Sequence, residues 1–154
     1  MRNTELHFAA KPQNFTVSAA NNFTCPQGKL HWKETIMSES KLRDQSLEFA
    51  VSVINLVKDL KSKHETIISN QIGRSGTSIG ANIREAQYAH GKPDFISKLQ
   101  IALKEANETG YWLELLYKTD YIAEQTYRSL DSACASIRVM LISSINTSNT
   151  SKEN

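Results

Sequence analysis

Apolar residues recur every three or four positions along most of the chain, which is the period of an amphipathic α-helix. Short polar stretches interrupt this pattern around His64, at Gly91 and Pro93, and around Thr119. Helices commonly end and begin at residues of these kinds. The sequence therefore predicts four helices, at about residues 40–63, 67–90, 93–118 and 121–146.

The connections between these helices are short, and short connections favour antiparallel neighbours. No segment has the sustained alternation of apolar and polar residues that is typical of a β-strand. We therefore predict an all-α protein in which residues 38–146 form an antiparallel, up-down-up-down four-helix bundle.

The segments on either side of the bundle have a different character. The helical pattern begins only after Met37, where Ser38 or Ser40 is a suitable N-cap. We expect residues 1–37 to be an irregular extension. Met37 is a candidate for the biological start, in which case the extension is an artefact of start-codon choice. Residues 147–154 are small and polar, so we expect a disordered tail there.

The glycine-rich stretch QIGRSGTSIGANIREA, residues 71–86, has two interpretations. A phosphate-binding loop of the Walker A type requires a lysine after its last glycine, and no lysine follows any glycine here. At 100° per residue, the isoleucines share one narrow arc, and Gly76 and Gly80 border it. We therefore predict a helix whose small residues let a neighbouring helix come close. Each interior glycine costs about 1 kcal/mol, so this helix must depend on tertiary packing.

A stripe of polar residues borders the apolar arc of this second helix. One interpretation is a solvated helix edge. The other is a buried or half-buried network of hydrogen bonds and ion pairs with the third helix, in which we expect Arg74 to form a buried ion pair with Glu108. The predicted polar network comprises Gln71, Arg74, Ser78, Asn82, Glu85, Glu105 and Glu108.

The third helix carries two apolar faces, whereas a helix of a monomeric bundle needs only one. The apolar arc of the first helix also covers about half of its circumference. A broad core would explain both observations, but a second face that contains a tryptophan favours a contact between subunits. The sequence therefore predicts a homo-oligomer, with interface residues Ile101, Trp112, Leu115 and Leu116.

The net charge limits the possible partners. The whole chain carries +2, but from Met37 onward 14 basic residues balance 14 acidic ones, so bulk charge does not favour nucleic-acid binding. Local cations remain candidates for phosphate contacts at a rim of the assembly, the alternative being a solvated helix face. The candidates are Lys58, Lys61, Lys63, Arg84 and Lys92.

No catalytic or metal-binding constellation emerges from the sequence. A ferritin-like di-iron site needs glutamate three positions before a histidine, and neither His64 nor His90 has one. Cys25 and Cys134 lie far apart without a CxxC motif, so we predict neither a disulfide nor a zinc site, and we expect Cys134 to be an inert buried thiol. No apolar run is long enough to span a membrane. We expect a non-enzymatic cytoplasmic protein without a cofactor or a catalytic residue.

Two long ordered patterns resemble a known family. The second helix reads Q-I-x-R-S-x-x-S-I-x-x-N-I-x-E-A, and the third contains I-A-L-K-E-A-x-E-T-x-Y-W-L. Over about residues 40–146 the chain resembles the bacterial four-helix bundle proteins named after the 23S rRNA intervening-sequence protein. These proteins are also similar to the accessory protein of diversity-generating retroelements.

This resemblance implies an up-down bundle that assembles into a barrel-like, ring-shaped homopentamer. The retroelement accessory protein is expected to be strongly basic, whereas this domain is near neutral. We therefore favour a non-enzymatic assembly protein of the intervening-sequence branch, whose name refers to the location of its genes. The alternative is a nucleic-acid-binding accessory factor, with RNA, DNA or a reverse transcriptase as its partner.

Overall fold

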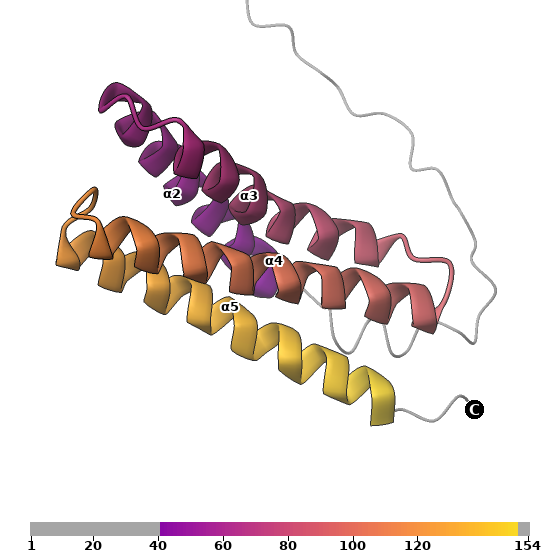
Figure 1. Cartoon of the computed structure of the whole chain (residues 1–154). Helices are drawn as coiled ribbons and strands as arrows, with labels where there is room; N and C mark the ends of the chain where they lie inside the picture. Colours follow the sequence, from indigo (N-terminus) through magenta and orange to yellow (C-terminus); the bar gives the residue numbers. More distant parts are fainter. Residues whose placement is uncertain (1–40, 151–154) are drawn as a thin grey trace, which may run out of the picture.

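The structure is a computed structural model that describes residues 41–150, and all regular secondary structure within this range is helical. The helices are α2 (Lys41–Ser62), α3 (Ile67–Gln87), α4 (Lys92–Lys118) and α5 (Glu124–Thr150), as Figure 1 shows. The predictions of an all-α class and of four helices are confirmed for this part of the chain. The expectations for residues 1–37, including Met37 as the start, and for the caps Ser38 and Ser40 lie outside the described residues.

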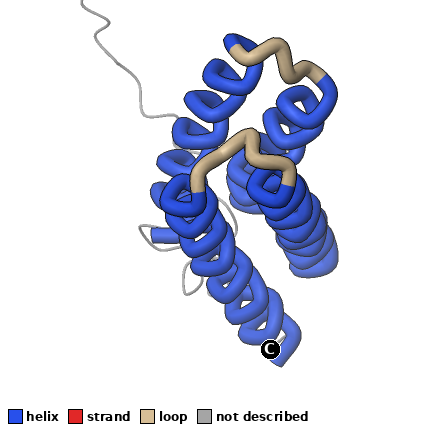
Figure 2. Tube along the Cα trace, turned by 60° about the vertical axis from the view of Figure 1, so that its left-hand side comes forward, coloured by secondary structure: helices blue, strands red, loops and turns tan. Residues whose placement is uncertain are grey.

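The four helices form a bundle in which each helix packs against two others. α3 lies between α2 and α4, while α5 packs against both α4 and α2 (Figures 1 and 2). Lys63 Nζ donates a hydrogen bond to the carbonyl oxygen of Tyr121 at 3.1 Å. This contact places the α2–α3 turn and the α4–α5 turn together at one end of the bundle (Figure 2). None of the described helices has an apolar stretch long enough to cross a membrane.

The core is built from the apolar faces that the helical period predicts. Ile72, Ile79 and Ile83, expected on one arc of the glycine-rich helix, are fully buried. Each such side chain contributes about 1.5 to 3 kcal/mol when it leaves water. The other helices supply large buried side chains that include Val53, Leu60, Phe95, Leu99, Leu113, Leu116, Ile137 and Leu141.

The glycines of α3 determine how closely α2 approaches. A Cβ atom on Gly76 would lie 2.8 Å from Val53 Cγ1, and one on Gly73 would lie 3.2 Å from Val57 Cγ2. Residues 71–86 lie wholly within α3, so the prediction of a helix with a close neighbour is confirmed. The glycines serve helix packing, because a larger side chain at Gly76 would overlap with the valine methyl groups.

The N-terminus of α3 is capped by a residue that the sequence analysis did not single out. The buried Glu65 carboxylate accepts hydrogen bonds from the backbone N–H groups of Ile67, Ile68 and Ser69 at 2.7–2.9 Å. An anion at this position also interacts favourably with the helix dipole. The preceding His64 has a φ of 61°, so this break in the helical pattern is a tight turn held by a carboxylate.

α5 extends beyond its predicted end at residue 146. It continues to Thr150, so residues 147–150, which we expected in a disordered tail, are helical. The side chains of Thr147 and Ser148 donate hydrogen bonds to carbonyl oxygens four residues earlier, and Ser148 is fully buried. A small, polar composition indicated disorder, but these hydroxyl groups find their partners on the helix itself. Residues 151–154 lie outside the described range.

Candidate subunit interface

The predicted polar network lies along α3 and α4, but it divides into separate contacts. Asn82 Nδ2 donates hydrogen bonds to the carbonyl oxygen and the hydroxyl oxygen of Ser78, at 2.9 and 3.1 Å. Glu85 pairs with Lys98 Nζ of α4 at 2.6 Å, which raises the pKa of Lys98. Lys98 was not among the predicted residues. Gln71 of α3 and Glu105 of α4 are partly buried.

The expected pair between Arg74 and Glu108 is present, but it is not buried. Arg74 Nη2 lies 4.0 Å from Glu108 Oε1, and the side chains are 76% and 36% exposed. Glu108 Oε1 also accepts a hydrogen bond from Trp112 Nε1 at 3.1 Å. The expectation of a buried ion pair is therefore wrong for the single chain, because Arg74 extends from the outer side of α3. An exposed pair of this kind contributes at most about 1 kcal/mol.

The buried polar contact between α3 and α4 is made by two other residues. Thr109 Oγ1 lies 2.9 Å from Ser75 Oγ and 2.8 Å from the carbonyl oxygen of Glu105. Ser75 and Thr109 are both fully buried. The sequence feature that could have predicted this contact is the small hydroxyl side chain on the otherwise apolar face of each helix.

Three of the four predicted interface residues reach the outer side of α4. Ile101 is 36% exposed, and Trp112 and Leu115 are partly buried. The inclusion of Leu116 is wrong, because this residue is fully buried in the core. Tyr111, which is 57% exposed, was missed, and its ring contacts Trp112 with a centroid distance of 4.8 Å.

We call this outer region of α4 the α4 patch, comprising Ile101, Glu108, Tyr111, Trp112 and Leu115. It combines exposed or half-exposed aromatic and aliphatic side chains with a carboxylate that binds the indole N–H. Apolar surfaces bordered by polar groups are typical of protein interaction sites. Tryptophan and tyrosine are also the residues that most often anchor such sites.

The candidate nucleic-acid contacts do not form one patch. Lys58, Lys61 and Lys63 are exposed in the last turns of α2 and just after it. Lys63 pairs with Asp59 at 2.8 Å in addition to its contact with Tyr121.

The remaining two candidates are far from these lysines. Arg84 and Lys92 flank the α3–α4 turn. α3 has 21 residues, so they are separated from the lysine cluster by about 30 Å. The structure therefore groups three of the five candidates and places the other two at the opposite end of α3.

The side chain of Cys134 is buried on the inner face of α5, as expected. Its Sγ atom lies 3.3 Å from the carbonyl oxygen of Ala106, and its side chain is inaccessible to solvent. Burial raises the pKa of the thiol to about 11. The prediction of a buried thiol is therefore confirmed. A protonated thiol without access to solvent is also a poor nucleophile. Among residues 41–150, no group of three or more histidine, cysteine, aspartate or glutamate side chains is arranged to hold a metal ion.

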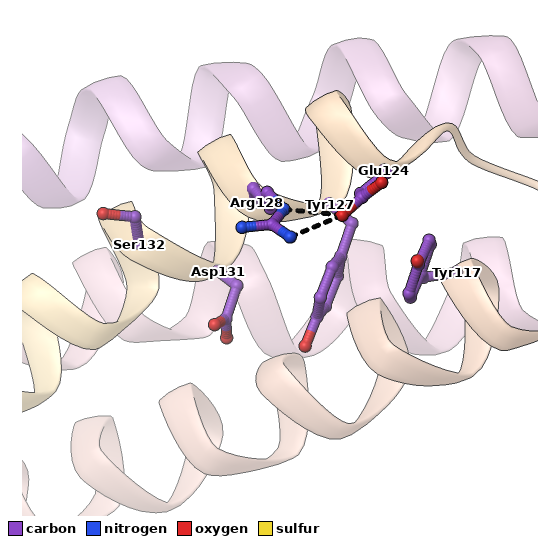
Figure 3. A pocket seen from close by; sticks show the side chains of 6 residues that line it. All are labelled: Tyr117, Glu124, Tyr127, Arg128, Asp131 and Ser132. Carbon is purple, nitrogen blue, oxygen red and sulfur yellow. Dashed lines mark hydrogen bonds and ion pairs between the residues drawn. The ribbon is translucent and has the colours of Figure 1, made fainter.

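A shallow pocket lies along α4 and α5 (Figure 3). Arg128 within it donates a hydrogen bond to Glu124 at 2.8 Å, and the stacked rings of Tyr117 and Tyr127 have a centroid distance of 4.7 Å. Asp131 faces Arg138 at 3.7 Å. The charged groups of this pocket already have partners within the chain, so we do not assign a ligand to it.

Comparison with known proteins agrees with the architecture. A family model described as 23S rRNA-intervening sequence protein matches residues 38–143. A similar solved structure is a protein of unknown function from the S23 ribosomal protein family of Bacteroides thetaiotaomicron. That protein is 56% identical, with a TM-score of 0.67, and the match covers 68% of this chain and 97% of the other. No curated protein matches this sequence. Because the family model covers more than half of its length, the chain belongs to the 23S rRNA-intervening sequence protein family.

Proposed function

We propose that this chain is a non-enzymatic assembly subunit, an antiparallel up-down-up-down bundle whose copies form a closed ring. The contacts between α3 and α4 support the antiparallel order. Ser75 lies opposite Thr109, whereas Glu85, further along α3, pairs with Lys98, which is earlier in α4. The pentameric stoichiometry follows from the family resemblance.

The α4 patch is the observation that carries this proposal. A single chain leaves Tyr111 largely exposed, and Ile101 and Trp112 only partly covered. Burying apolar surface in a second copy is favourable by roughly 25 cal/mol per Å². Association with another copy would therefore bury the second apolar face of α4, which the core of a single bundle leaves exposed.

The side chains of α4 and α5 that could take part in catalysis have features that support a structural role. Glu108 binds the Trp112 indole, and the carbonyl of Glu105 accepts a contact from Thr109. Burial raises the pKa of the Cys134 thiol still further above neutral pH, so the thiol stays protonated there. A free thiol also agrees with the reducing cytoplasm of a bacterium, where we place the assembly.

Light scattering coupled to size exclusion tests the assembly. At micromolar concentration we expect a mass that is a multiple of 17.3 kDa, five times this value for the pentamer. Ile101→Glu should reduce the mass to that of one chain while the helical circular dichroism signal is unchanged. Ile67→Glu is the matched control, because Ile67 is a strongly exposed isoleucine at the start of α3 and does not belong to the α4 patch. A monomeric wild-type protein would contradict the proposal.

A second candidate function is favoured by the exposed lysines at the end of α2. A ring would repeat Lys58, Lys61 and Lys63 around one rim, and repetition strengthens weak phosphate contacts. The partner would then be RNA or DNA, alone or together with a reverse transcriptase. A salt titration of RNA binding tests this function, since phosphate contacts are lost steeply as salt rises. Absence of binding at low salt would leave only the assembly role.

A further inference from the structure

The carboxylate of the α4 patch, Glu108, has two contacts on the same oxygen atom. Glu108 Oε1 accepts a hydrogen bond from Trp112 Nε1 at 3.1 Å, and it lies 4.0 Å from Arg74 Nη2. Arg74 belongs to the long ordered pattern of α3, whereas Trp112 belongs to the patch. Glu108 therefore connects the tryptophan of the proposed interface with a charge on the neighbouring helix.

The bond between Glu108 and Trp112 prepares the tryptophan for an apolar neighbour. A buried indole N–H without an acceptor is destabilising, so a buried tryptophan usually has a hydrogen-bond partner. Here the partner is supplied four residues earlier on the same helix. Trp112 can therefore be covered by apolar side chains without leaving its donor unpaired.

The same arrangement is unfavourable for the charge of Glu108. The Glu108 side chain is 36% exposed in the single chain, so solvent still reaches the carboxylate. A second copy that covers Trp112 would also exclude solvent from Glu108, because the two side chains are hydrogen-bonded. A carboxylate that loses its solvation is destabilising unless an opposite charge replaces it.

Arg74 is placed to supply that opposite charge. Its guanidinium group is within 4.0 Å of Glu108, while the side chain is 76% exposed and so has room to move closer. The planar guanidinium group can also donate two parallel hydrogen bonds to one carboxylate. Arg74 can therefore replace the lost solvation of Glu108 without a change in the backbone.

We propose that Arg74 and Glu108 form a close, buried ion pair when a second copy covers the α4 patch. Arg74 then serves assembly and contributes little to the stability of the single chain. This inference rests on the proposed assembly and assigns a role to two charges at that interface. It also accounts for the long and exposed contact that Arg74 makes within one chain.

The test is the dissociation constant of the oligomer, measured by analytical ultracentrifugation over a range of protein concentrations. Arg74→Ala should weaken assembly at least about tenfold, because Glu108 is then buried without an opposite charge. Adding Glu108→Gln should restore most of this loss. A neutral amide needs no opposite charge, and its carbonyl oxygen can still accept the hydrogen bond from Trp112.

Two controls separate this role from a general effect on the fold. Arg84→Ala removes another exposed arginine of α3, outside the patch, and should assemble as the wild-type protein does. In the Ile101→Glu background, which should not assemble, Arg74→Ala should change the midpoint of urea denaturation only slightly. A large destabilisation of this single chain would show that Arg74 is needed for the fold, and would overturn the inference.

The remaining outcomes distinguish the inference from the proposed assembly. A monomeric wild-type protein would contradict both. A wild-type oligomer that Arg74→Ala does not weaken, or whose weakening Glu108→Gln does not reverse, would overturn only the role of the ion pair.

Discussion

Single residues show where the helical period is informative and where it is not. The period correctly placed Ile72, Ile79 and Cys134 on inner faces, because an angle on the helix circumference determines which side points to the core. It failed for Leu116 and for the burial of Arg74. Both lie near the edge of an apolar face, where coverage depends on how closely the neighbouring helix approaches, and this distance is absent from the sequence pattern.

Arg74 and Thr109 should differ strongly in their contribution to stability. Arg74→Ala removes an exposed pair at 4.0 Å, so we expect a loss of less than about 1 kcal/mol in the free energy of unfolding. Thr109→Val leaves the buried Ser75 hydroxyl without its partner on α4, which should cost about 1 to 3 kcal/mol. Urea denaturation of the Ile101→Glu background measures both without a contribution from association. A larger loss for Arg74→Ala would restore the interpretation of a buried ion pair.

Cys134 should make stability depend on pH in the alkaline range. Burial raises the pKa of its thiol from 9.0 to about 11, so between these values the unfolded chain loses the proton while the folded chain keeps it. The contribution of the protonated thiol to the free energy of unfolding is therefore complete below pH 9, and it is lost as the pH rises through 11. Relative to Cys134→Ala, the wild-type free energy of unfolding should fall by up to about 3 kcal/mol. A difference that stays constant from pH 8 to pH 11 would disprove this assignment.

At the scale of the elements, most helix bounds were predictable because the chain marks them with turn residues. The break at Gly91 and Pro93 is an example, since α4 begins at Lys92. Two features were not predictable in the same way. Glu65 caps α3 through a side chain that only the folded turn positions, and the last turn of α5 contains Ser148, whose burial the sequence pattern does not indicate.

The approach of α2 to α3 gives a prediction with an internal control. Gly76→Ala places a methyl group 2.8 Å from Val53, so overpacking of about 1 to 3 kcal/mol should exceed the gain of about 1 kcal/mol in helix propensity. At Gly80 the nearest atom is Ser46 Oγ at 3.4 Å, so Gly80→Ala should be neutral or stabilising. Thermal unfolding at one fixed protein concentration compares the two. The opposite order of melting temperatures would mean that the glycines do not determine the helix spacing.

At the scale of the whole molecule, the long ordered pattern of α3 and α4 indicated both the family and the bundle, and the family match over residues 38–143 agrees. The sequence also indicated a second apolar face on α4. Leu47 and Val51 of α2 were not singled out from the sequence, although the helical period already puts Val51 on the side of the helix opposite Val53. The packed bundle shows which of these two sides faces the core, because Val53 is buried and Val51 is exposed.

The contact between Lys63 and Tyr121 has a consequence for any cyclic assembly. It gathers two of the three turns, together with Lys58 and Lys61, at one end of every bundle. Rotation about a single axis preserves direction, so if the bundles stand along that axis, all copies point the same way and the two mouths of the ring are chemically different. Such a ring is a polar object. One mouth carries the repeated lysines, and a partner that recognises them would bind one per ring, from one side only.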